Sequence, residues 1–127
     1  MARVRVPYVL DISRARTRYP HMDSLLTVKI DVDRGRRPVR IGRLCWLLRR
    51  AGYRVQWTSY RRSPSGTGWH QEIQTIPDIT SAVEVTAVQA ICGSDVAREA
   101  CNLTRARHVD RGTVSPFWKE RWNTLYA

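Results

Sequence analysis

The sequence of 127 residues is poor in cysteine and contains no long apolar run. Its three cysteines, Cys45, Cys92 and Cys101, stand apart and form no C-x-x-C pair, which argues against a disulfide framework and against a zinc knuckle. Residues 1–10 lack an apolar run of secretory length, and no stretch approaches the length of a bilayer span. We therefore expect a protein of the reducing cytoplasm that has no membrane partner.

Lysine and acidic residues are also scarce. All but two of the 22 basic residues are arginine, the exceptions being Lys29 and Lys119, and only 11 acids oppose them, which gives a net charge of +11. Codon bias in a GC-rich genome can replace lysine by arginine, but it does not explain the excess of base over acid. Arginine binds phosphate through two parallel hydrogen bonds and stacks on bases. The composition therefore predicts a nucleic acid or another phosphate-rich polyanion as partner.

Phenylalanine occurs once, but five tryptophans and a hydrophobic content of 43% are enough for a buried core. A disordered basic tail would lack such residues. Because 127 residues is the usual size of one domain, we expect residues 1–127 to form a single globular unit.

Alternating and helical spacings of apolar residues predict the elements. Strands are expected over 25–33, 53–60 and 69–76, and a weaker alternation predicts a last strand over 103–109. Val55 and Trp57 are expected to share one strand face. Helices are expected over 38–52, over 81–93 with a Ser81 and Glu84 capping box, over 95–101, and over 116–126, where Trp118, Trp122 and Leu125 form an apolar stripe for the core.

The predicted order is strand, helix, strand, strand, helix, strand, which is the βαββαβ arrangement of ferredoxin-like folds and RNA-recognition motifs. We therefore expect an α+β domain with its core in about residues 25–110 and an extra C-terminal helix. The helices would cover one face of the sheet and leave the other open.

Two acids on the first strand are the first candidate for chemistry. Asp31 and Asp33 alternate with apolar residues, so both are expected on the open face, side by side. Paired carboxylates can bind one hard cation, Mg²⁺ or Mn²⁺, and such a site suits phosphoryl transfer. The alternative is a pair of solvated residues that close the strand. Phosphate would be attracted by the basic residues around the pair, namely Lys29, Arg34, Arg36 and Arg37.

The segment RRSPSGTGWH, residues 61–70, is the second candidate. Its small residues let backbone N–H groups approach phosphate oxygens, its hydroxyls add donors, and Arg61 and Arg62 supply charge. His70 follows directly and is expected on the face that holds the acid pair. The segment predicts a phosphate-binding loop backed by His70, although a lone histidine is also often structural.

The segments KIDVD and SPSGTGWH resemble the archaeo-eukaryotic primase superfamily, which includes primase-polymerases of plasmids and viruses. In that family a D-x-D on the first core strand binds divalent metal, and an S-G-x-G-x-H element places its histidine against the phosphates of the incoming nucleotide. A later acid completes the metal site. The resemblance covers about residues 25–110, but the extra αβ unit and the zinc-binding element of many members are not visible.

The resemblance implies that Asp31 and Asp33 are metal ligands, and it leaves the third acid open between Asp95, one turn from Arg98, and Asp110. The expected nucleotide contacts at this site are Arg61, Arg62, Ser63, Ser65, Gly66, Gly68, His70 and Arg98. The expected nucleic-acid contacts are Lys29, Arg34, Arg36, Arg37, Arg105 and Arg107.

The expected function is a metal-dependent nucleotidyltransferase of the primase type in the replication of a virus or plasmid, located in the host cytoplasm if viral. Its partners would be nucleoside triphosphates, a single-stranded template or primer-template, and other replication proteins. A non-catalytic RRM-like binder of single strands is the alternative, but such modules stack bases on aromatic residues, whereas Asp31, Asp33 and Glu72 are acids. A replication-initiator nuclease would need two histidines where HQE at 70–72 supplies one, and a structural or regulatory role remains a further alternative.

Overall fold

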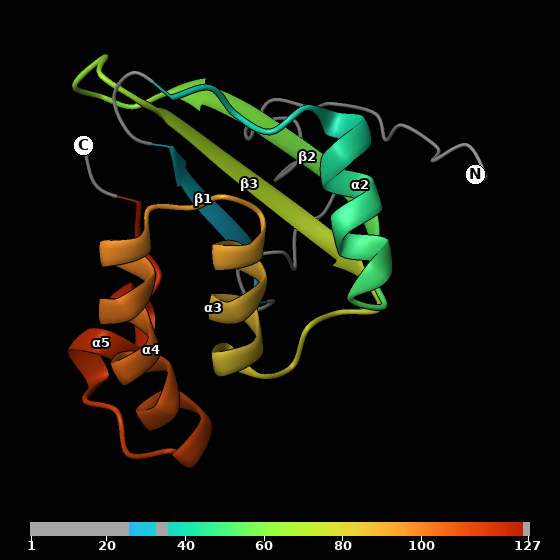
Figure 1. Cartoon of the computed structure of the whole chain (residues 1–127). Helices are drawn as coiled ribbons and strands as arrows, with labels where there is room; N and C mark the ends of the chain where they lie inside the picture. The colour runs from blue at the N-terminus through green and yellow to red at the C-terminus, as the bar shows by residue number, and fades with distance from the viewer. Residues whose placement is uncertain (1–25, 33–35, 126–127) are drawn as a thin grey trace.

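The computed structural model describes residues 26–32 and 36–125, which form an α+β domain (Figure 1). Its described elements, in chain order, are β1 (Val28–Val32), α2 (Ile41–Arg50), β2 (Arg54–Arg62), β3 (Trp69–Ile76), α3 (Ala82–Ile91), α4 (Val96–Arg111) and α5 (Pro116–Arg121). None of these helices is long and apolar enough to cross a membrane.

The three strands form one antiparallel sheet in the order β1-β3-β2. Val28 lies opposite Ile73 on β3, and Ile73 lies opposite Thr58 on β2. Helices α2 and α3 cover one face of this sheet (Figure 1). The core lies between these helices and the sheet. It includes Ile30 and Ile73, together with buried residues of α2, α3 and α4. The open α+β sheet with helices on one face is therefore confirmed.

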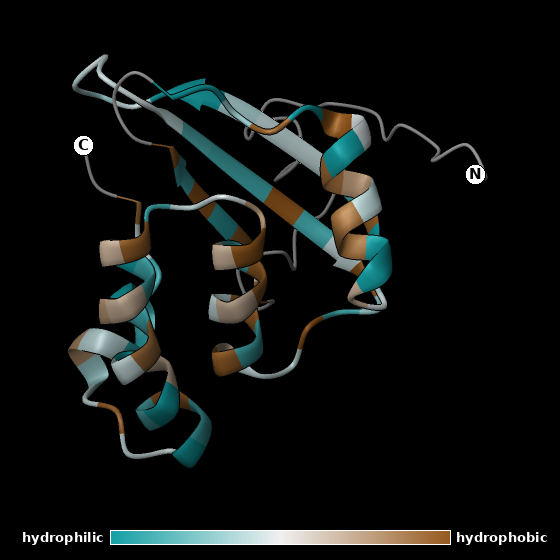
Figure 2. Ribbon diagram, in the orientation of Figure 1, coloured by the Kyte–Doolittle hydropathy of each residue, from teal (hydrophilic) through white to brown (hydrophobic). Residues whose placement is uncertain are grey.

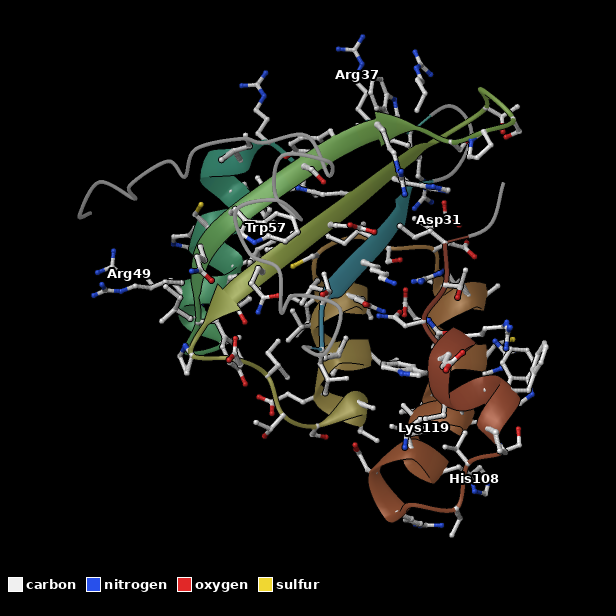
Figure 3. The ribbon with its side chains drawn as sticks, turned by 180° about the vertical axis from the view of Figure 1, so that it is seen from behind. Asp31, Arg37, Arg49, Trp57, His108 and Lys119 are labelled. Carbon is white, nitrogen blue, oxygen red and sulfur yellow. The ribbon has the colours of Figure 1, made fainter. Side chains whose placement is uncertain are left out.

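The central strand β3 is mostly polar and yet buried. In Figure 2 it is hydrophilic along most of its length, with one strongly hydrophobic band. The residues between its ends, from His70 to Thr75, are all buried. We call the sheet face away from α2 and α3 the far face; no described helix covers it (Figure 3). Its side chains nevertheless have little exposed surface, since Trp57 is 1% exposed and His70 2%.

A β-bulge in β2 changes the face on which Trp57 lies. Val55 pairs with Thr75 and Trp57 pairs with the next residue, Gln74, so Gln56 is the extra residue of the bulged strand. The expectation that Val55 and Trp57 share a face was therefore wrong. Val55 packs against the core under the helices, while Trp57 lies on the far face (Figure 3).

The predicted strand over 103–109 was wrong, because these residues lie inside the long helix α4. Leu103, Ala106 and Val109 recur at a spacing of three, which places them on one side of a helix. Ala106 is fully buried and Leu103 and Val109 are half-buried. Asp95 begins the helix by accepting a hydrogen bond from the Arg98 amide at 2.9 Å. The described part of the chain therefore shows β, α, β, β, α and then a further helix in place of a fourth strand.

The outer edge of β1, where a fourth strand would pair, is closed by other groups. The Lys29 amide donates to Gln89 Oε1 at 2.8 Å, and the Asp31 amide donates to Ser94 Oγ at 3.0 Å. Three carbonyls along this edge, one just before β1 and two within it, also accept hydrogen bonds: Thr27 from Asn123 Nδ2 at 3.1 Å, Lys29 from Arg98 Nη1 at 3.2 Å, and Asp31 from the Asp95 amide at 2.8 Å. Side chains and a helix N-terminus thus replace a strand at this edge.

The C-terminal helix α5 is shorter than expected and ends at Arg121. Trp122 directly follows this helix and is 5% exposed within the core. The prediction that Trp122 is a core residue is therefore confirmed. Trp118 and Leu125 are only half-buried. The guanidinium of Arg105 lies 3.8 Å from the centroid of the Trp118 ring. The stripe is therefore core at Trp122 and packs against α4 at Trp118.

Candidate functional site

Asp31 and His70 lie opposite each other on neighbouring strands. They form one pair of the β1-β3 ladder, and His70 Nε2 is 3.6 Å from Asp31 Oδ1. On β2, Arg61 pairs with His70 and is exposed. Since directly paired residues share a face, the three side chains stand in one row across the far face. Two motifs that are about forty residues apart in the sequence are thus brought together, as predicted.

The carboxyl of Asp31 is partly withdrawn from water. Its side chain is 28% exposed, whereas that of His70 is 2% exposed. Burial raises the pKa of Asp31 above its ordinary value. The charges of His70 and Arg98 oppose this rise, and those of Asp95 and Glu99 add to it. The site therefore favours the protonated form of Asp31 more than water does.

Asp95 is the acid that lies beside Asp31. Its amide donates to the Asp31 carbonyl, and its carboxylate caps α4. Asp110 lies at the other end of the same 16-residue helix, about 22 Å away along the axis. Of the two acids left open by the sequence, Asp95 is therefore the one that the fold brings to Asp31 and His70.

Asp110 caps the neighbouring helix α3. Its carboxylate accepts hydrogen bonds from Ser81 Oγ at 2.7 Å and from the amides of Ala82 at 2.7 Å and Val83 at 3.0 Å. Burial raises the pKa of Asp110, but these three hydrogen bonds outweigh it and lower the pKa below its ordinary value. Of the predicted capping box, the N-cap half is present, since Ser81 Oγ accepts from the Glu84 amide at 3.2 Å, while the Glu84 carboxylate accepts from Tyr53 Oη.

We expect Asp110→Ala to lower the free energy of unfolding at pH 7 by about 1–2 kcal/mol, because α3 loses a cap. A carboxyl whose pKa is lowered by folding stabilises the protein above its ordinary pKa, and this stabilisation is lost as the pH falls through the folded value. The difference from wild type should therefore shrink toward pH 3 in urea unfolding. Glu120→Ala, which removes an exposed acid on α5, is the control. Unchanged stability with loss of activity would instead make Asp110 the third acid of the site.

The loop between β2 and β3 is held by its own hydrogen bonds. The Ser63 amide donates to the Gly68 carbonyl at 3.0 Å, the Gly66 amide donates to the Ser63 carbonyl at 2.8 Å, and the Gly68 amide donates to Ser63 Oγ at 3.1 Å. Gly66 has a φ of +74°, which a residue with a side chain rarely adopts. The hydroxyls of Ser63 and Ser65 are 3.1 Å apart, and those of Ser65 and Thr67 are 2.7 Å apart. Three of the amides expected to face phosphate are thus used within the turn, while Arg61 and Arg62 at its base are exposed.

Arg98, expected as a nucleotide contact, is part of a polar cluster beneath β1. It donates to the Lys29 carbonyl, to Glu99 Oε2 at 2.6 Å, and to the Asn123 carbonyl at 2.9 Å. Gln89 Nε2 donates to Glu99 Oε1 at 2.6 Å, and Asn123 Nδ2 donates to Gln89 Oε1 at 2.8 Å. No motif in the sequence predicted this cluster. Its only signal was that polar residues occupy the inner positions of α3 and α4.

The expected nucleic-acid contacts are spread over the molecule. Arg36, Arg37 and Arg107 are exposed, and Lys29 is half-buried opposite Glu72 in the β1-β3 ladder. Arg105 stacks on Trp118. They do not form one group.

Asp33 and Arg34 lie outside the described residues, so the Asp31 and Asp33 pair stays a prediction. Within residues 26–32 and 36–125, no three His, Cys, Asp or Glu side chains gather closely enough to hold a metal ion. Comparisons of the chain with protein families, curated proteins and solved structures found no match.

Proposed function

We propose that the protein is a metal-dependent nucleotidyltransferase of the primase-polymerase type, acting in the replication of a virus or plasmid. The observation that supports this proposal is the row of Asp31, His70 and Arg61 across the far face, with Asp95 beside it. An acid, a histidine and an arginine that come from separate motifs are the groups that such chemistry needs around a triphosphate.

Asp31, together with Asp33, would hold Mg²⁺ or Mn²⁺. The electrostatics of Asp31 fit a cation, because burial and the charges of Asp95 and Glu99 all disfavour its bare carboxylate. A bound divalent ion would neutralise triphosphate charge during attack of a primer 3′-hydroxyl on the α-phosphate, with pyrophosphate leaving. Arg61 would bind the outer phosphates through its guanidinium, and His70 would position them.

The test is nucleotide incorporation by the full wild-type chain, on a primer-template and on a single-stranded template without primer. We expect incorporation with Mn²⁺ or Mg²⁺, none with EDTA, and heat on calorimetric titration with Mn²⁺. A protein that binds no Mn²⁺ and transfers no nucleotide would contradict the proposal. Nucleoside triphosphates would then not be partners of the protein, and the primase resemblance would describe ancestry only.

A non-catalytic binder of single-stranded nucleic acid is the second candidate, and the burial of the far face favours it. His70 is 2% exposed and Glu72 8%, which leaves little of the histidine to meet a nucleotide. Such a protein would bind strands equally well in EDTA and in Mn²⁺, and it would incorporate nothing.

A further inference from the structure

Within the described residues, the excess positive charge is confined to one part of the fold. Residues 36–71 contain nine arginines, all between Arg36 and Arg62, and no acid. Residues 72–125 contain six basic and seven acidic side chains, a net charge of −1. Residues 26–32 contain one lysine and one aspartate, which cancel. The excess charge of the described part of the chain therefore belongs to α2, β2 and the segment that precedes α2.

These nine arginines lie on α2, on β2 and on the segment before α2, and we call the exposed surface of these three segments the α2–β2 surface. All nine are exposed, and Figure 3 shows Arg37 and Arg49 pointing outward from the two ends of the region. Tyr60 Oη on β2 donates to the carbonyl of Val39 at 3.3 Å, which holds the segment before α2 against the strand. None of the nine forms an ion pair with an acid of the described residues.

Arginine at the start of α2 opposes the stability of that helix, whereas Arg49 and Arg50 in its last turn favour it. Its first turn contains no acid and its N-cap, Arg40, makes no side-chain capping bond. Cations near a helix N-terminus are unfavourable because the helix dipole is positive there. An arginine that lowers the stability of a helix and has no acidic partner inside the fold is typical of a residue kept for binding a partner outside the fold.

An aromatic ring lies within this charge. Arg43, Trp46 and Arg50 follow one another at helical spacing, with the guanidinium carbons of Arg43 and Arg50 at 5.7 and 5.0 Å from the Trp46 ring centroid. Trp46 is half-buried. A ring among arginines offers stacking to unpaired bases beside phosphate contacts, which is how sequence-tolerant single-strand binders work.

A lipid surface fits this region poorly. The large hydrophobic residues that are exposed are Ile76, Ile91, Val96 and Phe117, and these lie on β3, α3, α4 and α5. None lies on α2, whereas a helix that lies in a membrane interface buries an apolar face there.

We propose that the α2–β2 surface binds single-stranded nucleic acid, with its arginines on the phosphates and Trp46 stacked on a base. Arg61 belongs both to this surface and to the row of Asp31 and His70. Because β2 is an edge strand, a strand of nucleic acid that passes from α2 around the outer edge of β2 would reach the candidate site. The inference deepens the proposed function but depends only on the charge and the aromatic ring, since binding here needs no metal.

The experiment measures binding of a fluorescent oligothymidine to the full chain in EDTA, by anisotropy, over a range of salt. Arg43→Ala with Arg50→Ala should weaken binding at least about tenfold at low salt and reduce the slope of log K against log salt by about 1.4, because two phosphate contacts are lost. The matched control is Arg111→Ala with Arg121→Ala, which removes two exposed arginines from the ends of α4 and α5 and should change affinity less than about twofold. Equal losses in both pairs would overturn the proposal.

Trp46→Leu separates stacking from charge. It should weaken oligothymidine binding by about fivefold or more with an unchanged salt slope, and circular dichroism should show that α2 is retained. A hairpin duplex should bind more weakly than the single strand. Tighter duplex binding, or binding of anionic phosphatidylserine vesicles in place of the oligonucleotide, would overturn the assignment.

The two proposals can fail separately. Oligothymidine binding without nucleotide transfer would contradict the proposed function alone. Nucleotide transfer by wild type, with oligothymidine binding unchanged in the α2 variants, would contradict this inference alone.

Discussion

Asp31→Asn should reduce Mn²⁺-dependent nucleotide transfer by at least about a hundredfold, because even an outer-shell partner of a metal ligand typically contributes about 10–100-fold. The substitution keeps the shape of the side chain and removes the charge that would bind the cation. Primer extension with saturating nucleotide measures the loss. His70→Ala should act mainly on nucleotide affinity, and therefore raise KM more than it lowers kcat.

Loss of the fold would not explain this result. Burial raises the pKa of Asp31, so its charged form costs stability once the pH exceeds its ordinary pKa, and that cost is present at neutral pH. The neutral amide should leave stability at pH 7 unchanged or slightly higher. Mn²⁺ should raise the Tm of wild type but not that of Asp31→Asn. Glu120→Gln removes an equal charge from α5 as the control, and full activity in Asp31→Asn would refute the assigned role.

Trp122→Ala should lower the free energy of unfolding by about 3–5 kcal/mol, since it empties a large buried volume in the core. Trp122 is 5% exposed and lies in the same cluster as residues of the sheet and α3. Urea unfolding followed by circular dichroism measures the change.

The matched control is Phe117→Ala, which truncates an aromatic residue that is 54% exposed on the helix just before Trp122 and should cost little. A Trp122→Ala protein that keeps its Tm and loses affinity for oligothymidine would contradict this placement, because Trp122 would then be a binding residue.

The strand pattern was predicted well where one residue in two is apolar. Val28, Ile30 and Val32 are buried while Lys29 and Asp31 between them are half-buried, so the alternation of β1 was enough to assign its faces. The same logic placed His70 on the face of Asp31, and the register of the two strands then pairs these residues. Local chemistry also sufficed for the start of α3, where Ser81 is the N-cap and accepts a hydrogen bond from the Glu84 amide.

The errors have two physical origins. The β-bulge at Gln56 inserts one residue into β2, which reverses the faces of the residues after it and leaves no clear mark in the composition. In α4, Leu103 and Val109 fit a weak alternation and a helical spacing equally well, and the decision came from Asp95 and from packing on α3. Tertiary contacts outweighed the local pattern there.

The polar cluster could not be inferred for a further reason. Gln89 and Asn123 are 34 residues apart, and neither belongs to a recognisable motif. Only the fold brings them together under β1, where their purpose is to satisfy backbone groups. A sequence shows the need for such partners but not which residues supply them.

The closed edge of β1 also limits how this domain can be joined to other chains. Strands at sheet edges are the usual templates for strand exchange and for fibril growth, because they present unpaired amides and carbonyls. At Lys29 and Asp31 these groups are already engaged by Gln89, Ser94, Asp95 and Arg98. An incoming peptide would have to break a buried ion pair and a helix start to add to the sheet there. The protein is thus guarded against self-templating at this edge, so copies held close together would not fuse through β1.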